Sequence, residues 1–360
     1  MALKRITRLY LILGKTFNVW ITPIFVGIFI VLLRISIGFG RVLDNIFFAI
    51  KKTAIKSPII IVGNPRSGTT FLHRFLIQQG IGGGSELWQM IYPSIIVQKC
   101  LKPFLPLLEK ISPAKYHSTA AHQTSLTSVE TDDVSLLFRY MDGFFFYGFF
   151  LTFDKDNLFH WVDPKIRDTS LRDFDWFESM WKRNLYSNKQ ERYIGKLFSL
   201  SSNLPKFLNR FDNAKILYMI RDPLNVIPSG LSLVTGVLDK RFNFWSLDEK
   251  IKKRYIRRLY NALIELLNRF HHDWVHNKID KEKVLIVRFD TMMNDFESLM
   301  NDVLDFIGLE KSEEIIKSIK KTAESQRRYQ SGHKYDLDKF DLTEKKIRTD
   351  CKHIYETFLP

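Results

Sequence analysis

Two short segments of this chain carry arginine and hydroxyl side chains directly after apolar runs that are typical of buried strands. Residues 63–70 read Gly-Asn-Pro-Arg-Ser-Gly-Thr-Thr, and residues 221–229 begin with Arg221 and end with Ser229. A guanidinium presents a fork of N–H donors that matches phosphate oxygens, and a hydroxyl adds a further donor. The backbone N–H groups of a glycine loop bind an anion together with the positive end of the helix that follows. The two segments therefore predict two phosphate-binding sites.

The first segment has the glycine spacing of the nucleotide triphosphatase loop, G-x-x-x-x-G-K-[ST], at Gly63 and Gly68. The lysine of that motif is replaced by Thr69, and the loop carries Arg66 as a cation instead. An ordinary strand-to-helix turn uses the same glycines, so the loop alone does not decide the function. If the loop binds phosphate, we expect the contacts to come from Arg66, Ser67, Gly68, Thr69 and Thr70.

Taken together, the two segments resemble those of the P-loop sulfotransferases that use 3′-phosphoadenosine 5′-phosphosulfate (PAPS). The resemblance covers most of residues 57–360 and is strongest to the branch with many bacterial or membrane-associated carbohydrate and lipid sulfotransferases. It implies that the first loop holds the 5′-phosphosulfate, while Arg221 and Ser229 grip the 3′-phosphate. Arg192-Tyr-Ile-Gly-Lys196 resembles the lysine-bearing strand end of the family, which implies a catalytic role for Lys196 beside Arg66. The chain departs from the family after this lysine, where Leu-Phe-Ser replaces the usual Ser-Pro with its nearby histidine.

Two side chains are candidates for the general base that removes the proton of the acceptor. Glu86 lies in a segment, Gly83–Trp88, that resembles the one in which some branches of the family place a catalytic glutamate. His122 lies ahead of Glu130 and Asp132 in a segment that resembles the acceptor side of the family branch. A carboxylate and an imidazole can both take the proton of an attacking hydroxyl. The sequence leaves Glu86 and His122 as alternatives.

Three apolar runs predict a parallel sheet. Residues 58–62, 215–220 and 284–289 are short, rich in β-branched or other apolar residues, and separated by stretches long enough for helices. Ligands of open α/β sheets bind at the carboxyl ends of the strands, and both phosphate segments follow such ends. We therefore expect a three-layer, P-loop-like α/β fold over residues 57–360, preceded by an N-terminal hydrophobic helical extension over residues 1–56.

The N-terminal extension contains a charge-free run from Phe17 to Leu33, at the lower edge of the length that spans a bilayer. No small-residue cleavage site follows it before Arg34, which disfavours a secretory signal. Basic residues flank the run on both sides, so the positive-inside rule gives no orientation. We expect a membrane anchor that either spans the bilayer or lies in its surface; a buried helix of a soluble cytoplasmic protein is the alternative.

Composition is compatible with an anionic co-substrate. The chain has 360 residues, 54 Lys and Arg against 39 Asp and Glu, and a formal net charge of +15. This charge suits a nucleotide or an acidic membrane surface. No zinc-finger or RNA-stacking signature supports nucleic acid as a partner. Two cysteines far apart give neither a disulfide framework nor a metal cluster.

We therefore interpret the chain as an enzyme that transfers a sulfuryl group from PAPS to a hydroxyl of a carbohydrate, a lipid such as a glycolipid or sterol, or another small molecule. No metal is expected, because fixed cations would take the role that Mg²⁺ has in kinases. Two alternatives stay open. One is a P-loop nucleoside or metabolite kinase, against which the missing lysine of the loop speaks; the other is a non-catalytic, membrane-tethered nucleotide-binding protein.

Overall fold

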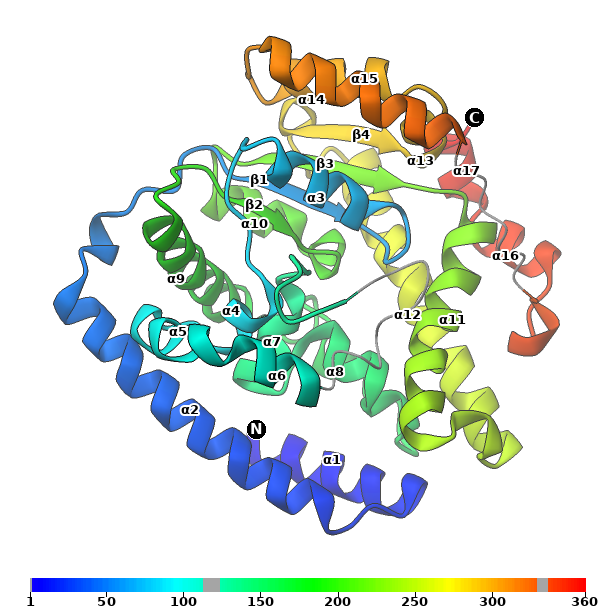
Figure 1. Cartoon of the computed structure of the whole chain (residues 1–360). Coiled ribbons are helices and arrows are strands. Elements are labelled where there is room, and N and C mark those ends of the chain that lie inside the picture. The colour runs from blue at the N-terminus through cyan, green and yellow to red at the C-terminus, as the bar shows by residue number, and fades with distance from the viewer. Residues whose placement is uncertain (1, 113–123, 329–335) are drawn as a thin grey trace. The chain divides into compact units, whose positions relative to one another are not determined.

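The structure is a computed structural model that describes residues 2–112, 124–328 and 336–360 (Figure 1). The helices of these residues are α1 (Ala2–Phe17), α2 (Thr22–Phe47), α3 (Thr69–Gln78), α4 (Leu87–Ile91), α5 (Ile95–Leu101), α6 (Leu105–Ile111), α7 (Asp133–Tyr140), α8 (Gly143–Phe149), α9 (Ser170–Asn188), α10 (Leu204–Arg210), α11 (Pro223–Phe242), α12 (Glu249–Val275), α13 (Phe289–Asn294), α14 (Phe296–Phe306), α15 (Glu313–Arg328), α16 (Glu344–Asp350) and α17 (Lys352–Phe358). The strands are β1 (Ile59–Gly63), β2 (Ile194–Lys196), β3 (Lys215–Ile220) and β4 (Val284–Arg288).

The chain divides into two compact units that alternate along the sequence. Unit 1 comprises residues 1–55, 83–191 and 233–262, and unit 2 comprises residues 56–82, 192–232 and 263–360. Both segments that predict phosphate sites therefore belong to unit 2. The helical N-terminal extension belongs to unit 1 together with later parts of the chain.

Unit 2 contains a four-stranded sheet in the order β2-β1-β3-β4, and every pairing is parallel. The three strands predicted from the sequence form within one residue of the expected bounds. The fourth strand, β2, has three residues and pairs with β1 at the edge of the sheet. The parallel register brings the carboxyl ends of β1, β2 and β3 to one edge, because parallel strands point the same way.

Helices cover both faces of this sheet, as expected for a three-layer fold. One face carries Ile61, Leu217 and Val287, which pack into a buried apolar cluster with side chains of α3, α13, α14 and α15. Tyr218 points to the other face, where its ring stacks on Phe270 of α12. Alternate strand residues point to opposite faces, and both faces are buried, so these strands read as continuous apolar runs in the sequence. The prediction of a parallel three-layer α/β fold is confirmed.

Unit 1 is formed by helices and short turns in the residues that the structure describes, and it contains α1 and α2. The charge-free run of the N-terminus does not form one helix. Helix α1 ends at Phe17, Asn18 has a left-handed φ of 54°, and α2 begins at Thr22 with Pro23 in its first turn. Proline suits the first turn of a helix, because the N–H groups there have no intrahelical acceptor. Helix α2 then continues past Arg34 to Phe47.

Candidate functional site

The loop between β1 and α3 has the backbone of a tight turn. Gly63 has a φ of +137°, and a Cβ at this position would lie 2.4 Å from the carbonyl oxygen of Met219 in β3. Gly68 has a φ of +90° directly before α3. Arg66, between them, also has a positive φ, 77°, which is uncommon for a residue with a side chain. Strained backbone of this kind persists where the surrounding structure enforces it, and it gathers at binding sites.

The N-terminus of α3 opens towards this loop. The N–H groups of Phe71 and Leu72 both donate to the carbonyl oxygen of Gly68. Since the first four N–H groups of a helix have no acceptor within the helix, those of Thr69 and Thr70 lie at its open, positive end. Arg66 and this helix end are both suited to an anion.

The two predicted phosphate segments meet. Arg66 donates from Nε to the hydroxyl of Ser229 at 3.0 Å, and Arg221 donates from Nη1 to the carbonyl oxygen of Arg66 at 2.8 Å. Arg66 and Ser229 are 163 residues apart in the sequence. They come together because β1 and β3 are adjacent and parallel, so the loops after them share one edge of the sheet. Unit 2 therefore holds both predicted grips in one cluster.

Lys196 reaches the same loop from the end of β2. Its ammonium group donates to the hydroxyl of Thr70 at 3.0 Å, and the residue is 3% exposed. A buried ammonium is costly unless partners with negative charge compensate it. The loop lacks the usual lysine at position 69, and β2 brings a lysine to the neighbouring residue instead.

Three supporting residues were not predicted. Asn64 is buried in the loop and donates to the carbonyl oxygen of Leu263 at 2.9 Å. The ring of Phe289 lies 4.1 Å from the Arg221 guanidinium, and Tyr355 donates to the carboxylate of Asp222 at 2.5 Å. Asn64 lies within the loop motif of residues 63–70, so its polar side chain at that position could have indicated a supporting role. Tyr355 follows Asp222 by 133 residues and has no local signal.

His73 lies one turn into α3 and joins this helix to β2. Its Nε2–H donates to the carbonyl oxygen of Ile194 at 2.9 Å, and the residue is fully buried. Burial, together with the nearby charge of Lys196, lowers the pKa of His73 to about 3. The imidazole is therefore neutral at physiological pH and serves as a hydrogen-bond donor beneath the loop.

Of the two candidate bases, the structure describes Glu86 alone. Glu86 belongs to unit 1, where its carboxylate accepts from the indole N–H of Trp88 at 2.5 Å and its backbone N–H donates to Gln89 at 2.9 Å. Burial raises the pKa of Glu86 above its ordinary value. His122 lies outside the described residues. Among the described residues, no group of three or more His, Cys, Asp or Glu side chains is arranged to hold a metal ion.

Comparison with known proteins identifies the family to which this geometry belongs. A sequence model of the sulfotransferase family matches residues 58–313, which include the loop after β1, Lys196, Arg221 and Ser229. The chain belongs to the sulfotransferase family. Two curated relatives of this chain are the omega-hydroxy-beta-dihydromenaquinone-9 sulfotransferases Stf3 of Mycobacterium bovis and Mycobacterium tuberculosis, each 22% identical over 266 residues. These matches cover 70% of this chain and 63% of the relatives, so the chain spans less than two thirds of their length.

Solved structures of sulfotransferases share the fold. The crystal structure of sulfotransferase STF9 from Mycobacterium avium is similar with a TM-score of 0.68 at 15% identity, over 89% of this chain and 81% of that chain. Sulfotransferase STF1 from Mycobacterium tuberculosis is similar with a TM-score of 0.67 at 18% identity, over 97% of this chain and 90% of that one. At these identities the likeness establishes the fold alone.

Proposed function

We propose that the protein transfers the sulfuryl group of PAPS to a hydroxyl group of an amphiphilic acceptor. The observation that carries the proposal is the junction of Arg66, Ser229 and Arg221, which brings the two predicted phosphate-binding segments to one edge of the sheet. PAPS has phosphate groups at both its 5′ and 3′ ends, whereas ATP has no 3′-phosphate for the second grip. Membership of the sulfotransferase family supports the same donor.

The residues of unit 2 have clear tasks in this reaction. The oxygen of the acceptor attacks sulfur, the bond between sulfur and the 5′-phosphate oxygen breaks, and 3′-phosphoadenosine 5′-phosphate (PAP) leaves with the electron pair. Negative charge grows on the leaving phosphate, where Arg66, Lys196 and the N-terminus of α3 stabilise it. Arg221 and Ser229 fix the nucleotide by its 3′-phosphate, which orients the reacting bond.

The proton of the acceptor hydroxyl goes to Glu86 or His122 in this proposal. The raised pKa of Glu86 favours proton acceptance, because a carboxylate with a higher pKa is a stronger base. Two observations favour an amphiphilic acceptor. The name of the Stf3 relatives specifies a hydroxylated menaquinone derivative, a lipid, and α2 is long and apolar enough to enter a membrane. Membrane association of the protein is part of the proposal.

The test is calorimetric titration of the full chain in detergent micelles with PAP and, separately, with ATP and Mg²⁺. We expect tighter binding of PAP. Arg221→Ala and Ser229→Ala should each weaken PAP binding, by at least about tenfold for the arginine, since hydrogen bonds to charged groups contribute roughly 1.5–3 kcal/mol. Arg210→Ala, which removes an exposed arginine of the same unit, is the matched control and should leave the affinity unchanged.

Turnover with labelled PAPS and a panel of hydroxylated lipids and sugars then tests the chemistry. Labelled product that disappears in Arg221→Ala supports the proposal. Tighter binding of ATP with Mg²⁺ would favour a kinase, and PAP binding without turnover on any acceptor would favour a non-catalytic nucleotide-binding protein. If Arg221→Ala, Ser229→Ala and the control bind PAP with equal affinity, the proposal that the second segment holds the 3′-phosphate is refuted.

A further inference from the structure

Helix α2 exposes apolar side chains along its whole length, and most densely in its first half. Its residues Ile24, Phe25, Ile28, Phe29, Val31 and Leu32 are between 50% and 68% exposed. Large apolar patches on a protein surface mark interaction sites. The helix is long and apolar enough to cross a bilayer, and only 11% of an apolar 18-residue segment within it is buried.

The second half of α2 is bound to unit 1 by a buried stripe. Ile37, Gly40 and Asp44 are buried and recur at helical spacing. The Asp44 carboxylate is fully buried, accepts the backbone N–H groups at the start of α5 at 2.9 and 3.0 Å, and pairs with Arg183 at 3.1 Å. Arg34, near the middle of α2, donates to the carbonyl oxygen of Phe138 at 3.0 Å. These polar side chains are engaged with protein and leave the apolar ones outside.

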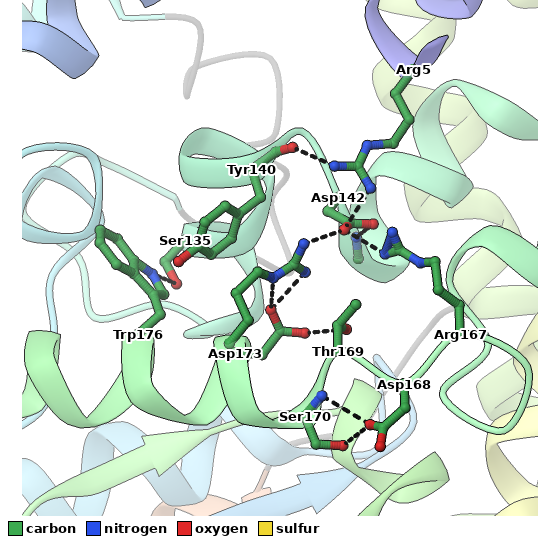
Figure 2. Close-up of polar contacts among 12 residues, drawn as sticks. Arg5, Ser135, Tyr140, Asp142, Arg167, Asp168, Thr169, Ser170, Asp173 and Trp176 are labelled. Atoms are coloured by element: carbon green, nitrogen blue, oxygen red, sulfur yellow. Dashed lines mark hydrogen bonds and ion pairs between the residues drawn. The ribbon is translucent and has the colours of Figure 1, made fainter. Parts of the chain in front are cut away.

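The segment before the apolar run is bound to the same unit. Arg5 of α1 pairs with Asp142 at 2.8 Å, and both side chains are buried. Figure 2 shows Arg5 and Arg167 converging on Asp142 from different elements, and the Arg167 distance is 2.5 Å. Arg8, one turn further along α1, pairs with Asp154 at 3.4 Å. The chain is thus fixed to unit 1 both before and after the exposed apolar residues of the first half of α2.

We propose that α2 lies in one leaflet of a membrane without spanning it, so that the chain enters and leaves the bilayer on the same side. A spanning α2 would place α1 and the C-terminal end of α2, which carries Asp44, on opposite sides of the bilayer. That arrangement would break the Arg5–Asp142 pair or the Asp44–Arg183 pair and leave a buried charge without its partner. The proposal rests on the proposed function for membrane association alone and adds the topology.

The charges around α2 favour a lipid surface over a second copy of the chain as the occupant. Lys15, Lys51, Lys52, Lys99 and Lys102 are exposed at or near the ends of the apolar stretch or on helices that follow it in unit 1. Lysines at the edge of an apolar face attract anionic headgroups, whereas two like faces would bring these charges together. Trp20, 38% exposed at the start of the apolar stretch, is a residue type that favours the membrane interface.

The topology is tested with a double variant, Lys4→Cys with Lys52→Cys, in a Cys100→Ser background; both lysines are exposed, and Cys351 is buried. The full chain is reconstituted into sealed vesicles and treated from outside with a membrane-impermeant maleimide. Intact-protein mass spectrometry should show molecules with zero or two labels, because both cysteines lie on one side. Molecules with one label would overturn the proposal, since a spanning helix exposes one cysteine in either orientation. Labelling after detergent addition should give two labels throughout.

The apolar surface is tested by co-sedimentation with vesicles of phosphatidylglycerol and phosphatidylcholine. Phe25→Asp with Phe29→Asp should lower the partition coefficient by at least about a hundredfold, because burial of each phenylalanine favours the bound state by tenfold or more. Ile316→Asp, an exposed apolar residue of unit 2, is the control and should bind like the unchanged protein. If the unchanged protein forms a dimer without detergent and does not bind vesicles, and the Phe25, Phe29 variant is monomeric, the apolar surface binds a second copy of the chain. That result would refute the proposal that it binds lipid.

The tests of the membrane surface and the tests of the nucleotide site can fail independently of each other. Neither phenylalanine lies in unit 2, so the affinity for PAP should be the same in the Phe25, Phe29 variant and the unchanged protein. Loss of vesicle binding with intact PAP binding supports the membrane surface. Failure of PAP binding in the unchanged protein refutes the nucleotide site and leaves the topology result standing.

Discussion

Acid should loosen the attachment of α3 to β2 through His73. The imidazole is fully buried, donates to Ile194, and has a pKa lowered to about 3 from an ordinary value of 6.5. Between pH 6.5 and 3 the unfolded chain binds a proton that the folded chain does not. Stability from this group is therefore complete above pH 6.5 and is lost as the pH falls.

The size of the effect follows from the two pKa values. Within this window, each pH unit changes the free energy of opening by about 1.4 kcal/mol. From pH 7 to pH 5 the unfolded histidine becomes almost fully protonated while the folded one stays neutral, which lowers the free energy of opening by about 2 kcal/mol. The loop that carries Arg66 precedes α3, so this proposed phosphate-binding loop should open with the helix.

Hydrogen exchange read by mass spectrometry on residues 69–78 measures this opening without assuming that both units unfold together. After correction for the intrinsic pH dependence of exchange, protection should fall about thirtyfold between pH 7 and pH 5. His73→Gln keeps an N–H donor without a titrating ring, and should show little of this loss. His276→Gln, at an exposed histidine, is the control and should behave like the unchanged protein. An equal loss in His73→Gln and the unchanged protein would refute the reasoning.

Four other substitutions test individual contacts. Gly63→Ala should lower the free energy of unfolding of unit 2 by about 2 kcal/mol or more, since its Cβ would meet a backbone oxygen at 2.4 Å and its φ is left-handed; a urea titration measures this. Lys196→Met should reduce kcat for sulfuryl transfer by roughly a hundredfold or more, with a smaller effect on PAP affinity. Glu86→Gln should remove the acid limb of the profile of kcat against pH if Glu86 is the base, and an unchanged profile would point to His122. Asp44→Asn should destabilise unit 1 by about 3–5 kcal/mol, because Arg183 keeps its buried charge without the carboxylate that pairs with it; thermal unfolding followed by tryptophan fluorescence detects it.

The sequence predicted the sheet because its strands follow local patterns, whereas the phosphate-binding role of the two segments stays a prediction. Apolar runs bounded by Pro58 and Gly63, or followed by Arg221, are unambiguous for strands that are buried on both faces. Once the strands are parallel, the loops after β1 and β3 must share an edge. The contact of Arg66 with Ser229 follows from that topology.

Other features depend on contacts that no local pattern reveals. The charge-free N-terminal run indicated a membrane segment, and nothing near Asp44 in the sequence indicates that Arg183 will hold it in a folded unit. The same holds for Arg5 and Asp142, which are 137 residues apart. The division into residues 1–56 and 57–360 stays an interpretation of the sequence. Contacts within the structure group the N-terminal helices with residues 83–191 and 233–262.

The late arrival of Arg183 has a consequence for the synthesis of this protein. Arg183 follows its partner Asp44 by 139 residues, and at about 5–20 residues per second a ribosome needs roughly 7–28 s to reach it. During this interval α2 has left the ribosome with its apolar side chains exposed and its buried acid unpaired. A nascent chain in this condition exposes apolar surface before the ion pair that docks the end of α2 can form. If the proposed membrane surface is correct, membrane contact would then precede docking, and the ribosome would stand at the bilayer while the rest of unit 1 is still being made.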